Sequence, residues 1–303
     1  MSLFPKNARV CFLGDSITHN NEYVSRICAY YIENKKELNV KFFNGGTSGG
    51  SIRTLLANFD SDVIAHKPTH AVIMIGINDS WRDALNICER GAGRFSRLKE
   101  AFGNYKNNLA TICEKLEELG CVITLCTPTP YDEYQVSETP ALRGGFALIA
   151  EYASHVRNFA KEKSYGLCDF HAYISEIAQS EKIINPDRVH PNSLGHYHMA
   201  KCFLAYQNED IGEFAPIPSY LDCWRDAVSK IRSIKATEHL VIQDYSLTTE
   251  QRIQKAREYL AGNQESAYAQ YFKSLSGAYL ELKPMQDKLE QRANELMDEL
   301  YGD

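Results

Sequence analysis

Short apolar runs alternate with stretches of helical spacing over the first two thirds of the chain. The runs are rich in β-branched and aromatic residues and have the length of strands: 8–13, 39–44, 70–75, 121–126 and 165–170. Between them, apolar residues recur every three or four positions, which predicts helices over 22–33, 52–65, 104–119 and 146–162. Strands that are apolar nearly throughout and alternate with helices predict an α/β fold, in which helices cover both faces of a five-stranded parallel sheet.

The pattern changes after about residue 209, where no run is convincing as a strand. The segment IGEFAPIPSY contains two prolines and predicts a linker, and three amphipathic stretches follow it, at about 221–231, 248–262 and 285–300. We therefore predict an α/β domain over 1–209 and an all-helical extension over 210–303 whose role the sequence does not indicate. Because two or three helices cannot bury their apolar faces alone, the extension must pack on the α/β domain or on a second copy of the chain.

Composition narrows the classes of function. The 303 residues are 44% hydrophobic and carry a formal net charge of -6, which does not favour nucleic acid as a partner. No apolar stretch is long enough to span a bilayer and the N-terminus lacks the apolar core of a signal peptide, so we expect a cytoplasmic protein without a membrane partner. The nine cysteines are scattered and form no C-x-x-C pair, which favours reduced thiols over disulfides or a zinc site.

Polar, glycine-rich clusters follow the predicted strands. GDSITHN follows the first strand, GGTSGGS the second and GINDS the third. A long loop, 127–145, follows the fourth strand, and NPDRVHPNSLGH comes after the fifth strand and a short helix-like stretch. In an open parallel sheet the ligand site lies at the carboxyl ends of the strands, so we expect these clusters to converge there.

The residues in these clusters can support acyl transfer. Ser16 is a candidate nucleophile, His190 a candidate base, and Asp187 lies three residues before His190, close enough to orient its ring. Candidate donors to an oxyanion are the Ser16 backbone N–H, a glycine N–H of the second cluster and the Asn78 side chain. Ser48 is an alternative nucleophile, because GTSGG at 46–50 fits the G-x-S-x-G pattern of another hydrolase class.

Four blocks in order resemble the SGNH (GDSL-type) hydrolases, over about residues 8–207. They are GDSIT at 14–18, N-x-G-x-S-G at 44–49, G-x-N-D at 76–79 and D-x-x-H-P at 187–191. The resemblance implies a flavodoxin-like three-layer α/β/α sandwich that uses no metal or other cofactor. It also implies Ser16 as nucleophile, His190 and Asp187 as its partners, and an oxyanion hole formed by Ser16, Gly49 and Asn78. By this likeness GTSGG serves to present Gly49, and Ser48 is not the nucleophile.

Further residues near these blocks have two interpretations each. We predict substrate contacts for His19, Trp81, Tyr131 and Tyr134; the alternatives are a plain surface histidine and aromatic side chains that cover loop backbone. For Asp15 and Asp79 we predict bonding of loop amides, and for Asn44 a tie within the second loop, with a direct substrate contact as its alternative.

Two other residue groups are expected to be structural. Asp169 and His171 could offer a second acid and base, but no serine-bearing loop accompanies them. His196 and His198 follow Ser193, which we expect to cap a helix from about 194; one histidine would then pack against the sheet and the other be exposed, without zinc.

Together these features predict a serine esterase that hydrolyses small acyl esters through an acyl-enzyme. A carbohydrate or other small O-acetyl ester is the preferred substrate, and a lysophospholipase or thioesterase is the alternative enzyme. The alternative of another class is a non-catalytic ligand-binding module on the same fold.

Overall fold

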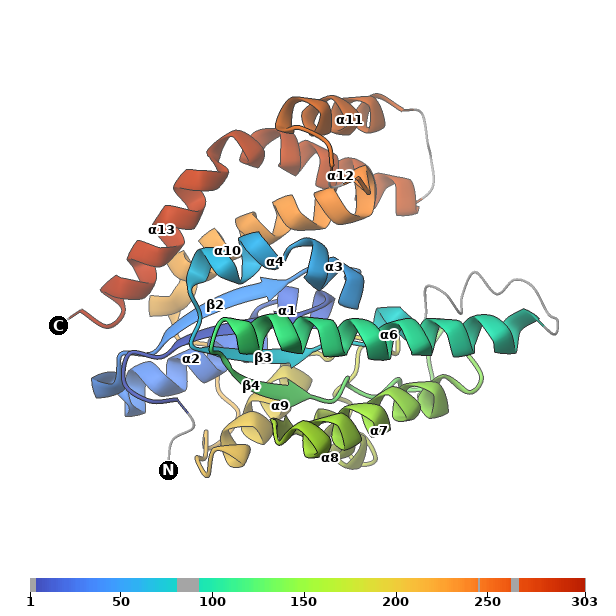
Figure 1. The fold of residues 1–303 in the computed structure, drawn as a ribbon, viewed down its shortest axis with the longest axis vertical. Helices are drawn as coiled ribbons and strands as arrows, with labels where there is room; N and C mark the ends of the chain where they lie inside the picture. Colours follow the sequence, from blue (N-terminus) through green and yellow to red (C-terminus); the bar gives the residue numbers. More distant parts are fainter. Residues whose placement is uncertain (1–3, 81–92, 245, 263–266, 303) are drawn as a thin grey trace.

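The computed structural model describes residues 4–80, 93–244, 246–262 and 267–302. Its sheet has five parallel strands in the order β2-β1-β3-β4-β5 (Figure 1). The strands are β1 (Arg9–Gly14), β2 (Lys41–Gly46), β3 (His70–Met74), β4 (Val122–Cys126) and β5 (Gly166–Cys168). This is the flavodoxin-like order, whose ligand site lies where the strand order reverses, at the carboxyl ends of β1 and β3. The predicted sandwich with a helical extension is confirmed.

Helices cover both faces of the sheet because each central strand is apolar on both sides. In β1, Val10 and Phe12 face one helical layer while Cys11 and Leu13 face the other. The first layer is α2 (Glu22–Asn34), α8 (Phe170–Ile177) and α9 (Ser193–Tyr206). The second layer is α3 (Ile52–Ala57), α4 (Phe59–Asp62), α6 (Gly93–Glu118) and α7 (Gly145–Lys163).

Three details of the predicted helices are wrong. The helix expected over 52–65 is broken at Asn58, where α3 ends and the short α4 begins, and a 3-10 turn follows it (Ile64–His66). Helix α6 begins at Gly93, well before residue 104; Gly103, a weak helix former, stands directly before the predicted start. The cap of α9 is Asn192, whose side chain accepts from the Gly195 N–H, so Ser193 is instead the first helical residue.

The helical extension contains four α-helices among the described residues and lies along one flank of the sandwich (Figure 1). They are α10 (Asp222–Thr237), α11 (Thr249–Ala261), α12 (Ala267–Leu282) and α13 (Gln286–Glu299), with a π-helical segment, Glu238–Ile242, directly after α10. Helix α12 was not predicted, because aromatic residues, serines and a glycine interrupt any leucine stripe.

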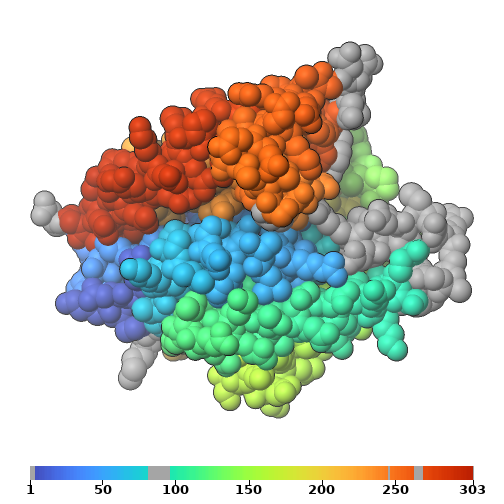
Figure 2. Space-filling view, turned by 45° about the horizontal axis from the view of Figure 1, so that its top comes forward, coloured from blue at the N-terminus to red at the C-terminus, as the bar shows by residue number. Residues whose placement is uncertain are grey.

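The extension packs on the α/β layers of its own chain. Leu221, Trp224 and Val228 join the apolar core that β1, β2, α2 and α9 build, and Met297 of α13 joins it too. In Figure 2 the extension, orange to red, lies directly on the residues coloured blue. This packing buries the apolar stripe of α10 within one chain; a second copy and the division at residue 209 stay predictions.

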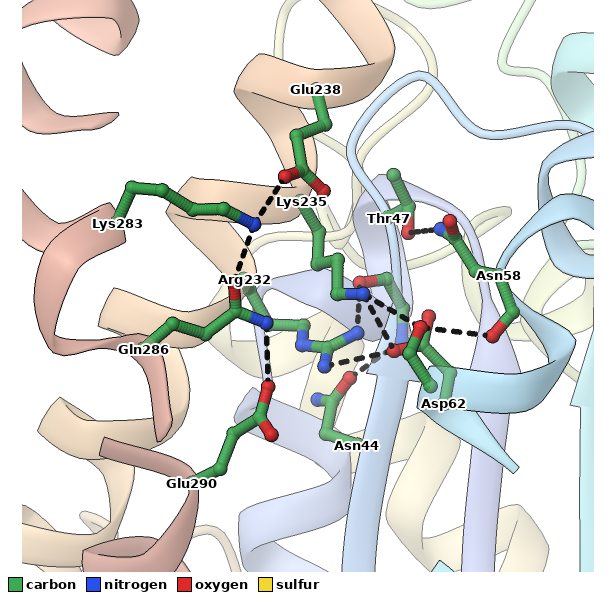
Figure 3. Close-up of polar contacts among 12 residues, drawn as sticks. Asn44, Thr47, Asn58, Asp62, Arg232, Lys235, Glu238, Lys283, Gln286 and Glu290 are labelled. Atoms are coloured by element: carbon green, nitrogen blue, oxygen red, sulfur yellow. Dashed lines mark hydrogen bonds and ion pairs between the residues drawn. The ribbon is translucent and has the colours of Figure 1, made fainter. Parts of the chain in front are cut away.

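Buried charges also cross this contact (Figure 3). Arg232 of α10 lies 3.2 Å from the Asp62 carboxylate, and both side chains are almost fully buried. Lys235, one turn further on, donates to the Ser61 hydroxyl at 2.7 Å and lies 3.8 Å from Asp62. Glu238 in turn accepts from Lys283 at 2.6 Å, which ties the end of α10 to the segment before α13. The extension is therefore fixed to α4 by paired charges as well as by apolar packing.

None of the helices in the described ranges is long and apolar enough to cross a membrane.

Candidate active site

Ser16 stands at the carboxyl end of β1, as the first residue of the short helix α1 (Ser16–His19). Asp15 caps this helix: its carboxylate accepts from the Ile17 N–H at 3.0 Å. The chain can turn so sharply because Gly14 precedes it; a Cβ there would overlap the Thr18 hydroxyl and the Met74 carbonyl. As a first helical residue, Ser16 has a backbone N–H without an intrahelical acceptor.

His190 and Asp187 reach Ser16 from the loop between α8 and α9. The Ser16 Oγ lies 2.7 Å from the His190 Nε2, and the His190 Nδ1 lies 2.8 Å from one Asp187 carboxylate oxygen. The other carboxylate oxygen accepts from the backbone N–H groups of Val189 and His190, both at 2.9 Å. The loop thus folds around the Asp187 carboxylate, and this fixes the imidazole with one nitrogen on the serine.

Burial and hydrogen bonds shift the pKa values of Asp187, His190 and Asp15. Burial alone would raise the pKa of Asp187, but hydrogen bonds from the His190 ring and from two backbone amides lower it to about 2. The Asp187 hydrogen bond raises the pKa of His190 against the opposing effect of burial. Burial raises the pKa of Asp15 to about 6, and its hydrogen bond to Ile17 fits the predicted structural role. The imidazole can therefore accept a proton from serine and share the resulting charge with a carboxylate.

The turn after β2 brings Gly49 to the same place. The Gly50 N–H donates to the Thr47 carbonyl at 2.8 Å, and Gly49 has a φ of 68°, which favours glycine. Within the described residues the backbone N–H groups of Ser16 and Gly49 donate to no protein acceptor. The Asn78 side chain spends one N–H on the Gly50 carbonyl at 2.8 Å and keeps the other. Three donors therefore border one cleft, the arrangement that an oxyanion requires.

Side chains beneath this turn hold it in place, as predicted for Asn44 and Asp79. The Asn44 amide donates to the Thr18 carbonyl at 2.7 Å and accepts from the Gly46 N–H at 2.8 Å, so it links the first and second loops. The Asp79 carboxylate accepts from the Ile52 N–H at the start of α3. Neither side chain lines the cleft, so the structure favours the structural interpretation of both.

The cleft has a volume of about 530 Å³, and both regions of the chain build it. The α/β region supplies the residues above together with Ser48, Tyr131, Thr139, Pro140, Leu142 and Val189. The helical extension supplies Leu240, Tyr271 and Phe272. Beside Leu240, the His239 Nε2 lies 3.0 Å from the Gly49 carbonyl oxygen, so the extension also contacts the turn that presents the Gly49 N–H.

Of the residues predicted to contact substrate, Tyr131 is the one in the described lining of the cleft. Tyr131 lines the cleft, and its hydroxyl accepts from the Leu142 N–H at 2.9 Å. Tyr134 is 79% exposed and lines a second hollow with Phe146 and Ser175, and the described lining of that hollow does not include Ser16. The His19 backbone packs against Gly46 at the end of β2. Burial, helped by the charge of Arg232, lowers the pKa of its side chain to about 4. Trp81 lies outside the described residues.

The alternative nucleophile, Ser48, and the alternative acid and base, Asp169 and His171, are not arranged for a reaction in the cleft. Ser48 borders the cleft, but no described hydrogen bond joins it to a histidine. Asp169 accepts both guanidinium hydrogen bonds from Arg157, at 2.7 and 2.9 Å, and caps α8. It is held as a structural ion pair, with His171 buried beside it.

The expectation that either His196 or His198 is exposed is wrong. His196 stacks on Tyr23, with ring centroids 6.2 Å apart. His198 is also buried, because Tyr173 and Glu181 cover the second side of α9. In the part of the chain that the structure describes, no group of three or more His, Cys, Asp or Glu side chains could hold a metal ion.

The sequence interpretation missed two residues that support the site. Arg188, with a φ of 71°, donates to the carbonyl groups of Thr139, Asp132 and Gln135, and so fastens the 127–145 loop to the loop of Asp187. The sequence did contain a signal for Arg188, because it stands directly after Asp187 within the D-x-x-H-P block. For His239 the sequence held no signal, because nothing local relates the extension to the second loop.

The similarity to known proteins coincides with the region that carries this geometry. A family model described as the GDSL-like lipase/acylhydrolase family matches residues 12–197. An acetylxylan esterase of Geobacillus stearothermophilus is 28% identical over 214 residues, which are 65% of this chain and 92% of that protein.

Solved structures show the same fold. A catalytic mutant of an acetylxylan esterase from Geobacillus stearothermophilus superposes with a TM-score of 0.59 at 25% identity, over 71% of this chain and 100% of its own. Structures described as catalytic mutants of that enzyme replace a serine, an aspartate or a histidine by alanine. A gut microbial diltiazem-metabolizing enzyme covers 99% of this chain and 96% of its own with a TM-score of 0.79; at 16% identity it shows the fold alone, with the extension included.

Proposed function

This chain belongs to the GDSL-like lipase/acylhydrolase family and is an esterase, and from that premise we propose that it cleaves small acyl esters with Ser16 as nucleophile. The observation that carries the proposal is the unbroken chain of hydrogen bonds from the Ser16 Oγ through His190 to Asp187. These hydrogen-bonded side chains lie at the edge of an open cleft, beside the backbone N–H groups that can donate to an oxyanion. A structural histidine would need neither the serine nor the cleft.

The proposed reaction has two halves. The His190 Nε2 takes the Ser16 proton while the Oγ attacks the ester carbonyl carbon, and the oxyanion accepts hydrogen bonds from the N–H groups of Ser16 and Gly49 and from Asn78. The protonated imidazole then gives its proton to the departing alcohol, which leaves an acyl group on Ser16. In the second half His190 takes a proton from water, the hydroxide attacks the acyl carbon, and the acid leaves with Ser16 reprotonated.

We propose an acetyl group as the acyl part of the substrate. The name of the Geobacillus relative supports this choice, since the similarity covers nearly all of that protein. The name of this relative also suggests a carbohydrate as the alcohol part of the ester. A lysophospholipase or thioesterase is the alternative, and the rates on 4-nitrophenyl acetate and octanoate separate the two. Faster cleavage of the octanoate ester would contradict the acetyl proposal.

Labelling with a fluorophosphonate probe tests the nucleophile. We expect the wild-type protein and Ser48→Ala to be labelled, and Ser16→Ala to be unlabelled and inactive. Ser48 borders the same cleft, so Ser48→Ala is a matched control for any change in its shape. The reverse pattern would move the nucleophile to Ser48, and an unlabelled wild-type protein would favour a non-catalytic binding module.

A further inference from the structure

The helical extension forms one wall of the cleft next to the catalytic serine. Leu240 comes from the π-helical segment after α10, and Tyr271 and Phe272 come from α12. Tyr271 is 46% exposed, so much of its ring faces solvent in this open cleft. These three side chains lie outside the region that matches the family model, which ends at residue 197. The wall is therefore a feature that the family chemistry does not account for.

The wall is fixed rather than a loose flap on the surface. Phe272 packs edge-on against Tyr259 of α11 at a centroid distance of 5.9 Å, and its ring is tilted against the neighbouring Tyr271 ring at 5.7 Å. Next to Leu240, His239 contacts the Gly49 carbonyl. The buried pair Arg232–Asp62 anchors the preceding helix to α4. The position of the wall relative to Ser16 is thus set by contacts on both sides of the cleft.

The chemistry of the lining favours an apolar ligand group. Apart from the residues assigned to the reaction, four of the nine described lining residues bear a hydroxyl group, and two of these four are tyrosines whose rings are apolar. Its other members are leucine, proline, valine and phenylalanine side chains. A sugar brings several hydroxyl groups that lose water on binding and must find partners, and this lining offers few. A flat apolar group has no hydrogen bonds with water to replace on entering it, and it gains by burial.

The size of the cleft indicates which part of the ester lies there. A cavity of about 530 Å³ is in the range that holds a drug-sized molecule, whereas an acetyl group has only three heavy atoms. If the acyl group is acetyl, the remaining space belongs to the alcohol. The wall then lies against the alcohol part of the substrate.

We propose that Leu240, Tyr271 and Phe272 bind a flat, apolar group of the alcohol, so that the substrates are acetyl esters of aromatic or similarly flat apolar alcohols. This inference rests on the proposed esterase function with an acetyl acyl group. It assigns to the helical extension the selection of the alcohol, while the α/β region carries out the hydrolysis.

Selectivity between two acetate esters tests the proposal. The measurement is kcat/KM for 2-phenylethyl acetate divided by kcat/KM for methyl acetate, with an acetylated xylo-oligosaccharide as a third substrate. In Tyr271→Ala we expect this ratio to fall about tenfold, the scale of losing the burial of one aromatic face. Tyr271→Phe keeps the ring and should keep the ratio. Leu260→Ala, an exposed apolar position on α11 outside the cleft, is the matched control and should also keep it.

Three outcomes would overturn the proposal. One is an unchanged ratio in Tyr271→Ala. Another is an equal loss in Tyr271→Phe, which would assign recognition to the hydroxyl group and hence to a polar alcohol. The third is a wild-type preference for the xylo-oligosaccharide.

Binding of 2-phenylethanol separates failure of the inference from failure of the proposed function. Calorimetry on Ser16→Ala should show binding that weakens about tenfold when Tyr271→Ala is added. An enzyme that cleaves no acetate ester but shows this weakening refutes the acetyl-ester function and keeps the apolar wall. An enzyme that cleaves acetate esters but whose binding of 2-phenylethanol does not depend on Tyr271 keeps the function and refutes the wall.

Discussion

The α/β region and the helical extension meet at one cleft but contribute different kinds of side chain to it. From the α/β region come the groups that can take part in a reaction. Ser16, Gly49 and Asn78 follow the carboxyl ends of strands, and Asp187 and His190 lie on the loop between α8 and α9. The extension contributes apolar side chains and a histidine that contacts the second loop from behind. A parallel sheet brings reactive groups together at one edge. Helices added beside that edge can change the lining of the cleft without moving the reactive groups.

The ion pair at the active site and the ion pair that joins the two regions differ in their exposure to solvent. His190 and Asp187 have side chains that are 40% and 49% exposed, which leaves them open to substrate and water. Arg232 and Asp62 are 4% and 3% exposed. A pair that moves protons needs access, whereas a pair that only joins two regions is stable in a dry contact if its charges compensate each other. The predictions below test this division between chemistry and support.

The largest effect is expected at the carboxylate behind the histidine. Asp187→Asn removes the charge that compensates the protonated imidazole and changes the hydrogen bond that fixes its tautomer. We expect kcat to fall about 10⁴-fold, with the fold retained by circular dichroism. If kcat falls less than about tenfold, Asp187 does not act through His190.

The same pair predicts a pH dependence. His190 must be neutral to accept the serine proton, and the Asp187 contact raises its pKa above the ordinary 6.5. The rate should therefore fall as the pH drops through a value above 6.5. In Asp187→Asn the main cause of the rise is lost, so the acid limb of kcat/KM should move to lower pH. A limb at or below pH 6.5 in the wild-type enzyme contradicts the assignment.

The next largest effect on kcat is expected at Asn78. Asn78→Ala removes the side-chain donor to the oxyanion and should lower kcat by about 10²- to 10³-fold with little change in KM. The hydrogen bond to the Gly50 carbonyl is lost too, so a melting curve is needed beside the kinetics. Turnover equal to that of the wild type would remove Asn78 from the oxyanion hole.

A change in the buried pair should affect stability and leave the chemistry in place. Arg232→Leu leaves the Asp62 carboxylate buried with the more distant Lys235 as its one remaining ion pair among the described residues, and should lower the free energy of unfolding by about 3 kcal/mol in urea titration. Arg292→Ala is the matched control within the extension, because the Arg292–Glu299 pair is half exposed; its cost should be much smaller than that of Arg232→Leu. Equal costs for the two variants would contradict the anchoring role of Arg232.

The smallest effect is expected where the extension contacts the second loop. His239→Ala removes the hydrogen bond to the Gly49 carbonyl, and we expect kcat to fall about tenfold while KM stays the same. His239→Gln retains an N–H donor and should recover most of this loss. A change in KM alone, or no recovery with glutamine, would show that His239 supports the packing of the extension and not the oxyanion turn.

The sequence by itself determined the strands, their parallel arrangement and the edge at which the polar clusters meet. Apolar runs of strand length between helical stripes leave few topologies open, and the carboxyl ends of parallel strands lie at one edge in all of them. That is why Ser16, Gly49, Asn78 and His190 could be placed together from local patterns. The order of the strands then put β1 and β3, with Ser16 and Asn78, side by side.

Only the tertiary structure decided what lies around that edge. The direction of the Tyr134 side chain, the burial of His198 and the approach of Leu240 and Tyr271 to Ser16 depend on contacts between segments far apart in the chain. The stripe on α10 showed that the helix must bury one face, but equally apolar surfaces were available on the sheet, on the other helices and on a second copy. A local pattern records how much surface a helix must bury, whereas the choice of partner comes from the shape and charge of the surfaces that meet.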